Sequence, residues 1–229
     1  MARGSWLLAA VATQSLAVLA ATAAQPGHNA PPAAVPGGAA WALLLLAAAV
    51  GWWLAGMVLY GLLAASIWPR LFAALRGSAW AWFGADDWIV MGGLAIAALA
   101  ATQIILAARA APAVNTVLGG LGLGASAVAM TAWVAASGWI LPLAILQLRC
   151  IARALTRRGH HRTAPDPAAW WAAVFPLGMY AVASHALATA LGLAALEAVA
   201  QVFLWIALAA WLATSLGIAA PWLAGLARR

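Results

Sequence analysis

Charged side chains are scarce in this sequence, and acidic ones most of all. Of the 229 residues only 7% are charged and four are acidic, while 67% are hydrophobic and the mean hydropathy is +1.00. A water-soluble domain of this size needs far more polar surface to stay wetted. The scarcity therefore excludes a soluble globular protein and indicates an integral membrane protein.

Cysteine and metal-ligand clusters are also lacking. The one cysteine, Cys150, excludes an intrachain disulfide. The pair His160-His161 has only Asp166 nearby and no fourth ligand at useful spacing, so it predicts no metal site. The glycine run at 119–124 follows no strand and lies in an apolar stretch, so it is not a phosphate-binding loop. We expect neither a metal nor a cofactor.

Long apolar runs dominate what is present. A membrane-spanning helix needs about 20 apolar residues, and six stretches reach that length: about 5–24, 39–68, 88–108, 117–148, 170–192 and 196–216. This pattern predicts an all-α integral membrane protein, a single transmembrane domain (1–229) of six helices in three hairpins. The fourth stretch is too long for one upright span and should tilt, or project beyond Pro142. Residues 69–87 are predicted to be a linker whose Asp86 and Asp87 cap the third helix.

The arginines alternate between the ends of these spans. They lie before the first span (Arg3), between the second and third (Arg70, Arg76), between the fourth and fifth (Arg149, Arg153, Arg157, Arg158, Arg162) and at the C-terminus (Arg228, Arg229). With a cytoplasmic N-terminus, only Arg109 falls outside, as the positive-inside rule requires. We expect a plasma (inner) membrane protein with both termini cytoplasmic. Its basic loop 149–169 would touch anionic lipid headgroups, and no nucleic acid would bind.

The first stretch has two interpretations. A short basic start, an apolar run and a small-residue end at Ala21-Thr22-Ala23-Ala24 resemble a secretory signal peptide. The run is longer than is usual for such a signal and carries Thr13-Gln14-Ser15 at its centre. A retained helix keeps the arginine pattern consistent, so we favour it.

Polar residues gather on the first, third and fifth spans. They are Thr13, Gln14 and Ser15 on the first, Gly92-Gly93 and Thr102-Gln103 on the third, and Phe175-Pro176 with His185 on the fifth. Polar groups inside a membrane usually face a cavity or the bundle interior. These three helices are therefore predicted to form the inner set.

The segment WWAAVFPLGMYA at 170–181 is the most informative part of the chain. Proline inside a helix removes a backbone donor and kinks or opens the helix, so Phe175 beside Pro176 is either a core aromatic or a plug in a permeation path. At 100° per residue, Phe175, Gly178, Val182, His185 and Thr189 lie within about 80° of each other. Tyr180 and Ser184 point the opposite way. His185 is either a pore-lining donor or titrating group, or a neutral histidine paired across helices.

This segment resembles the signature on the ninth helix of the tellurite-resistance/C4-dicarboxylate transporter family, which includes the slow-type anion channels. The stretch WLLAAVATQSLAV (6–18) is similar to the family's fifth helix, and DDWIVMGGLAI (86–96) to the start of its seventh. The resemblance implies a ten-helix bundle of five hairpins whose odd helices line a pore, usually as a trimer. It makes Phe175 the occluding residue and Pro176 its kink. The implied pore-lining residues are Thr13, Gln14, Ser15, Gly92, Gly93, Gln103, Gly178, Val182 and His185.

The resemblance covers essentially all of this chain but only the last six of the family's ten helices. Three hairpins do not obviously close a pore that five hairpins close in the family. The expectation is a truncated or mis-started product, or a chain that assembles with itself. The family's trimer would not replace the missing helices, since each of its protomers has a pore of its own.

The expected function is passive or proton-linked movement of small anions, such as a C4-dicarboxylate or a tellurite-related oxyanion, through a pore gated by Phe175. One alternative is a non-transporting membrane subunit or an inactive fragment. A remote one is a rhomboid-like intramembrane serine protease, suggested by Gly124-Ala125-Ser126-Ala127 and His185. That motif lacks its second glycine and its histidine lies on the wrong span, so no enzyme is expected.

Overall fold

A computed structural model describes residues 3–25, 38–77, 83–110, 122–156 and 170–226. A short 3₁₀ turn, η1 (Gly4–Leu7), leads into α1 (Leu8–Ala23), and a second turn, η3 (Ala85–Trp88), leads into α3 (Ile89–Ala110). The other helices are α2 (Gly38–Leu75), α5 (Gly122–Thr156), α6 (Trp171–Leu191) and α7 (Ala194–Leu226). Six of these segments are long and apolar enough to cross a membrane, which confirms the all-α fold and the six predicted spans.

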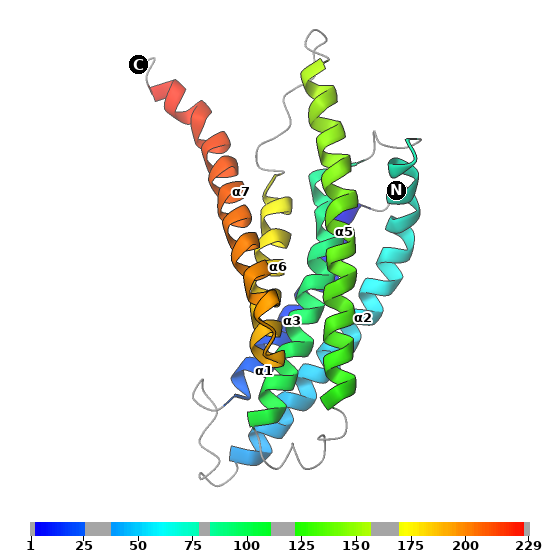
Figure 1. Ribbon diagram of the computed structural model, residues 1–229, viewed down its shortest axis with the longest axis vertical. Coiled ribbons are helices and arrows are strands. Elements are labelled where there is room, and N and C mark those ends of the chain that lie inside the picture. The colour runs from blue at the N-terminus through cyan, green and yellow to red at the C-terminus, as the bar shows by residue number, and fades with distance from the viewer. Residues whose placement is uncertain (1–2, 26–37, 78–82, 111–121, 157–169, 227–229) are drawn as a thin grey trace.

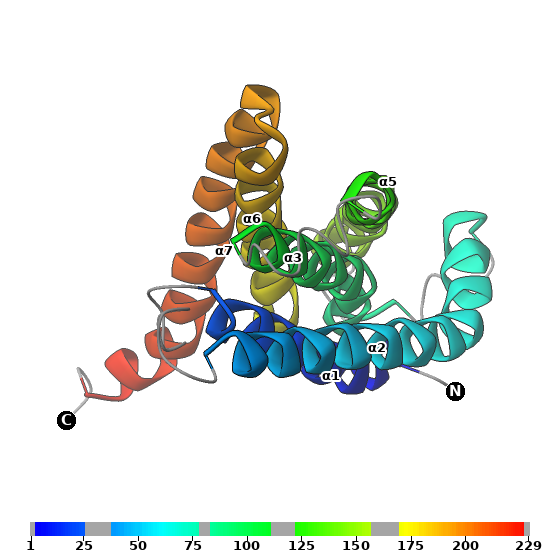
Figure 2. The ribbon, with the colours of Figure 1, turned by 90° about the horizontal axis from the view of Figure 1, so that it is seen from below.

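The helices pair as three antiparallel hairpins, α1–α2, α3–α5 and α6–α7, and α3 stands at the centre (Figures 1 and 2). It packs against α1, α2, α5 and α6, so 83% of its most apolar window is buried. The corresponding share is 56% for α6 and 33% for α1, but only 28%, 17% and 11% for α5, α2 and α7. The first, third and fifth spans are thus the inner set, as the polar residues predicted.

Three helices run further than the sequence suggested, and one of them is α7, which ends at Leu226 rather than near 216. α2 continues through Pro69 to Leu75, where a linker was predicted, and it changes direction near that end (Figure 2). The turn after Pro69 stays helical because Leu71 and Ala74 are buried, and packing of an apolar face stabilises a helix more than propensity does. α5 runs unbroken through Pro142 to Thr156, so the first part of the predicted basic loop is helical. There Arg149 donates to the Leu75 carbonyl of α2 over 3.0 Å.

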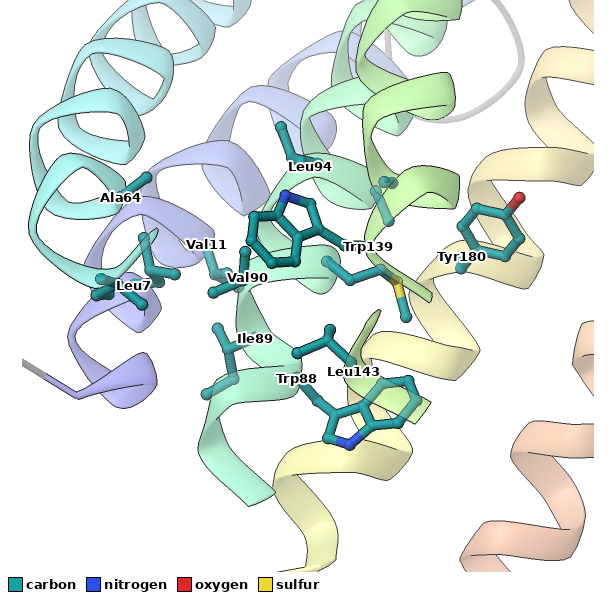
Figure 3. Close-up of a cluster of buried hydrophobic side chains, with 14 of the residues drawn as sticks. Leu7, Val11, Ala64, Trp88, Ile89, Val90, Leu94, Trp139, Leu143 and Tyr180 are labelled. Atoms are coloured by element: carbon teal, nitrogen blue, oxygen red, sulfur yellow. The ribbon is translucent and has the colours of Figure 1, made fainter. Parts of the chain in front are cut away.

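Small residues let the neighbouring helices approach α3 closely. A Cβ on Gly92 would lie 3.0 Å from Pro176 of α6, and one on Gly93 would lie 2.8 Å from the ring of Tyr60 on α2. Close contact between small residues is the main source of helix association in lipid, where burial of apolar surface gives no driving force. Larger side chains fill the space around these contacts. Figure 3 shows one cluster that contains Leu7 of η1, Val11 of α1, Ala64 of α2, Val90 and Leu94 of α3, and Trp139 and Leu143 of α5.

Buried hydrogen bonds then fix the rotation of the helices about α3. Tyr60 donates its hydroxyl to the Val90 carbonyl over 2.9 Å, and Trp53 donates its indole N–H to the Ala97 carbonyl over 3.0 Å. Gln14 of α1 donates to the Trp53 carbonyl over 3.2 Å. Each bond would have to be broken without water to replace it if a helix turned, because the surroundings are apolar.

Acidic residues tie three helix ends together where α3 begins. Asp87 is fully buried, forms an ion pair with Arg70 of α2 and accepts a hydrogen bond from the Gly84 backbone over 3.0 Å. Asp86 accepts from the backbone N–H of Ser5 over 3.2 Å. The predicted capping role of this acidic pair is therefore confirmed for Asp87, and both residues also join α3 to its neighbours.

The contact of Gly92 with Pro176 generates the first prediction. Gly92→Leu should lower the free energy of unfolding by about 1–3 kcal/mol, because the added side chain forces α3 and α6 apart. Gly138→Leu on α5 is the matched control, since a Cβ there meets no atom of the described residues within 4 Å. Reversible unfolding in mixed micelles measures both. Equal stabilities for the two variants would show that the α3–α6 contact is not close in the folded protein.

The Arg70–Asp87 ion pair generates the second prediction. Asp87→Asn keeps an acceptor for the Gly84 N–H but deprives Arg70 of its charged partner, and should cost about 3 kcal/mol of unfolding free energy. Arg70→Met with Asp87→Asn should recover much of that loss, because no buried charge is then left without its counter-ion. The same unfolding assay gives the double-mutant cycle. Additive losses from the two single variants would contradict a coupled pair.

Candidate functional site

α6 carries the segment at 170–181 and presents two different faces. The helix runs unbroken through Pro176 and ends at Gly192, whose φ of 68° and ψ of 30° are left-handed, a conformation that glycine adopts at no steric cost. The buried face includes Pro176, Tyr180, Ser184 and Leu187. The opposite face is exposed, and its members are those that the helical spacing grouped together.

The exposed face forms one stripe along α6, which we call the Phe175 stripe. Phe175 is 37% exposed and Val182 is 52% exposed, His185 and Thr189 are also exposed, and Gly178 is half-buried. A Cβ on Gly178 would meet no atom of the described residues within 4 Å, so the stripe is open at that position. The stripe thus combines an aromatic ring, a small residue and a polar end.

Pro176 holds the Phe175 backbone from behind. Its ring lies against Gly92 of α3, and it is among the most completely buried residues. The compact proline ring packs closely here because Gly92 has no side chain, and a larger residue at position 92 would clash with it. Pro176 therefore fixes Phe175 on the exposed side and α6 against α3.

The buried face of α6 is held by a polar network with α5. Trp133 donates its indole N–H to Ser184 over 2.8 Å, and the hydroxyls of Ser137 and Tyr180 lie 2.6 Å apart. The Tyr180 ring stacks on Trp133 and meets Phe203 of α7 edge-on, with centroids 5.7 and 4.6 Å away. This network makes the orientation of the opposite face specific, because rotation of α6 would strand several buried polar groups.

A contact between a histidine and a carboxylate lies at the polar end of the Phe175 stripe. His185 Nδ1 lies 2.7 Å from Glu197 Oε2 in the first turn of α7, and the two side chains are 63% and 40% exposed. A carboxylate only accepts, so Nδ1 carries the hydrogen and donates it. Gln201, one turn further along α7, is exposed as well.

The predicted residues of α1 separate. Gln14 is buried and bonded to α2, while Ser15 is exposed and Thr13 is half-buried. The hydroxyls of Thr13 and Ser15 donate to the carbonyls of Ala9 and Val11 in their own helix. Consecutive residues lie 100° apart on a helix, so the three cannot share one face.

The predicted residues of α3 are not on an exposed face either. Gly92 and Gly93 are buried at the contacts with Pro176 and Tyr60, because the surface of α3 is covered by four neighbouring helices. Gln103 is half-buried near the other end of α3 and accepts from the Gln25 side chain over 2.8 Å. The structure brings together Phe175, Gly178, Val182 and His185, and separates them from Gln14, Gly92 and Gly93.

Glu197 is a site residue that the sequence reasoning missed. Its signal was present: it is the only acidic residue beyond position 166, and it follows His185 by twelve residues across a hairpin turn. Within the described ranges, no cluster of three or more His, Cys, Asp or Glu side chains is placed to hold a metal. His160, His161 and Asp166 lie outside those ranges.

Comparisons with known proteins place this geometry in a family. Uncharacterized membrane proteins from two strains of Mycobacterium tuberculosis are 35% identical to the chain over 128 residues. That segment is 56% of this chain and 59% of each relative, so it spans little more than half of either. No solved structure matches the chain significantly. A family model described as voltage-dependent anion channel matches residues 1–219. Since that match covers nearly the whole chain and agrees with the resemblance carried by residues 170–181, the protein belongs to the voltage-dependent anion channel family.

Proposed function

We propose that this protein moves small anions across the plasma membrane and that the Phe175 stripe is a wall of the path they take. Membership of the anion channel family supports the general activity. The proposed substrates are small anions such as C4-dicarboxylates or tellurite-related oxyanions. The arginine pattern supports an orientation with both termini in the cytoplasm.

One observation carries the assignment of the wall: the hydrogen-bonded side chains of His185 and Glu197 are exposed within a membrane span. α6 has 21 residues and so measures about 31 Å, close to the thickness of the hydrocarbon core. His185 lies six residues before the end of α6, about 9 Å inside it. Facing lipid there, a histidine–carboxylate pair would be costly, and such groups normally line water-filled cavities or protein contacts. The polar end of the stripe therefore favours a wet surface.

Phe175 is the proposed gate on that surface. Its ring lies on the same side of α6 as Val182 and His185 and is partly exposed. Pro176 and Gly92 behind it keep the backbone in place, so the ring narrows the path unless its side chain rotates. Ser15 on α1 is a further proposed wall residue. Gln14, Gly92, Gly93 and Gln103 are proposed to support the wall from behind.

Selectivity is proposed to come from pore width and a positive field rather than from a tight binding site. Arg76 and Arg149 are exposed at the proposed cytoplasmic end, and Arg149 is held there by its bond to Leu75. No arginine of the described ranges lies in the middle of a span. Concentrating anions at the mouth without binding them firmly suits rapid passage.

A non-transporting membrane subunit is the second candidate. The observation that favours it is that no helix of the described ranges covers the Phe175 stripe, so in this chain the proposed wall is an open surface. If the stripe faced a protein partner instead of water, the His185–Glu197 pair would also be kept away from lipid. The two candidates differ in whether the stripe is wet and in whether anions pass.

Phe175→Ala tests the gate. In proteoliposomes, the variant should pass chloride and malate at least about tenfold faster than wild type, because a steric barrier has been removed. Phe72→Ala is the matched control, since Phe72 is a similarly exposed phenylalanine on α2, far from the stripe. If Phe175→Ala and wild type both fail to exceed empty liposomes, the chain is not a transporter by itself and the subunit candidate is favoured.

Water accessibility tests the wall independently of flux. In a Cys150→Ser background, Val182→Cys should react with a charged, membrane-impermeant thiol reagent in intact vesicles, because thiolates form only where water reaches. Val202→Cys on α7 is the control, because its side chain is similarly exposed, at 56%, and does not belong to the stripe. Labelling at both positions, or at neither, would remove the evidence for a wet stripe.

A further inference from the structure

The His185–Glu197 pair presents an electrostatic difficulty for the proposed anion path. Glu197 sits in the first turn of α7, where the helix dipole stabilises a carboxylate. Its side chain is 40% exposed and bonded to His185, which belongs to the Phe175 stripe. A negative charge on the wall repels a passing anion, and low-dielectric walls around a narrow wet path strengthen that repulsion. Anions can use this path readily only when the charge is balanced.

The chemistry of the pair supplies that balance. Nδ1 of His185 already donates its hydrogen to Glu197 Oε2, so a further proton can be taken up only at Nε2. Without that proton the pair carries a net charge of about −1, and with it the imidazolium and the carboxylate sum to about zero. One proton on His185 therefore removes the repulsion without breaking the bond at 2.7 Å.

We infer that the His185–Glu197 pair is a proton-binding site that sets the rate of anion passage along the Phe175 stripe. The inference rests on the proposed anion path and names the residues that control it. Protonation of His185 Nε2 opens the path electrostatically, and Phe175 obstructs it sterically. The two controls lie ten residues apart on one helix face, about 15 Å along its axis.

The charged surroundings of the pair are few. From α3, Arg109 donates to the Ala190 carbonyl over 2.6 Å and so places a permanent positive charge near the end of α6. The ionisable residues of α5 are Arg149, Cys150 and Arg153. They lie at the far end of that antiparallel helix, beyond the contact of Ser137 with Tyr180. Glu197 is the only ionisable residue of α7 in the described range, and Tyr180 is on the buried face of α6.

The test is chloride flux as a function of pH. Chloride keeps its charge at every pH, and equal pH on both sides of the vesicle removes any proton gradient. All variants carry Phe175→Ala so that flux is measurable. The parent should pass chloride about tenfold faster at about pH 5 than at about pH 8, because acidification supplies the proton that balances the charge of Glu197.

Glu197→Gln keeps a hydrogen-bonding partner for His185 but removes the charge. It should raise the flux at about pH 8 to at least the acidic rate of the parent and abolish the increase on acidification. His185→Gln should have the opposite effect, a low flux throughout, because Glu197 loses its compensating cation. Thr131→Val on α5, an exposed threonine whose hydroxyl donates to the Ala127 carbonyl of its own helix over 2.8 Å, is the matched control and should keep the pH dependence of the parent.

The opposite signs of the two variants guard against a folding artefact, since a misfolded protein lowers flux in both. If the parent conducts and Glu197→Gln keeps its pH dependence, the inference is overturned while the anion path stands. If no variant, the parent included, exceeds empty liposomes, the anion path fails and the inference with it. Equal changes in Thr131→Val and Glu197→Gln would also overturn it, because a site-specific charge would not be the cause.

Discussion

The structure depends on how closely other helices can approach α3. Alanine and glycine dominate its surface, and where Gly92 meets Pro176 the two helices come as near as side-chain volume allows. In lipid, such contact supplies the stabilisation that burial of apolar surface from water gives to a soluble protein. α1, α2, α5 and α6 share this one support, and α7 joins it through α6. A bulkier α3 would therefore loosen all three hairpins together.

That support also explains why α6 has a defined exposed face. Pro176 against Gly92 sets the distance between α6 and α3, while Ser184 and Tyr180 with Trp133 and Ser137 set its rotation. Once both are fixed, Phe175 and His185 have to point outward. The outward orientation of the Phe175 stripe therefore results from packing on the opposite face of α6. No function is proposed for that opposite face.

The sequence predicted the fold better than the site. Apolar runs of spanning length and polar residues on alternate spans gave the six helices and the inner set, because both depend on composition over many residues. Helical periodicity grouped Phe175 with His185 and separated them from Tyr180, but it could not say which face is covered.

Gln14, Gly92 and Gly93 were assigned to a pore surface, and the structure buries them at helix contacts. Polarity and small size suit both locations, and only the position of neighbouring helices distinguishes them. Glu197 was missed because its importance depends on a partner across a hairpin.

The proline of α6 has a consequence for the speed of any gate. Since Pro176 is locked against α3, a swing of the whole helix would have to separate two closely packed backbones, and such collective motions take microseconds to milliseconds. The Phe175 ring needs only its own two side-chain torsions to move, and partly exposed side chains change rotamer in picoseconds to nanoseconds. An aromatic gate of the kind proposed for Phe175 would open and close many times during the approach of a single ion. It would act as a steady resistance rather than as a door with long open and closed periods.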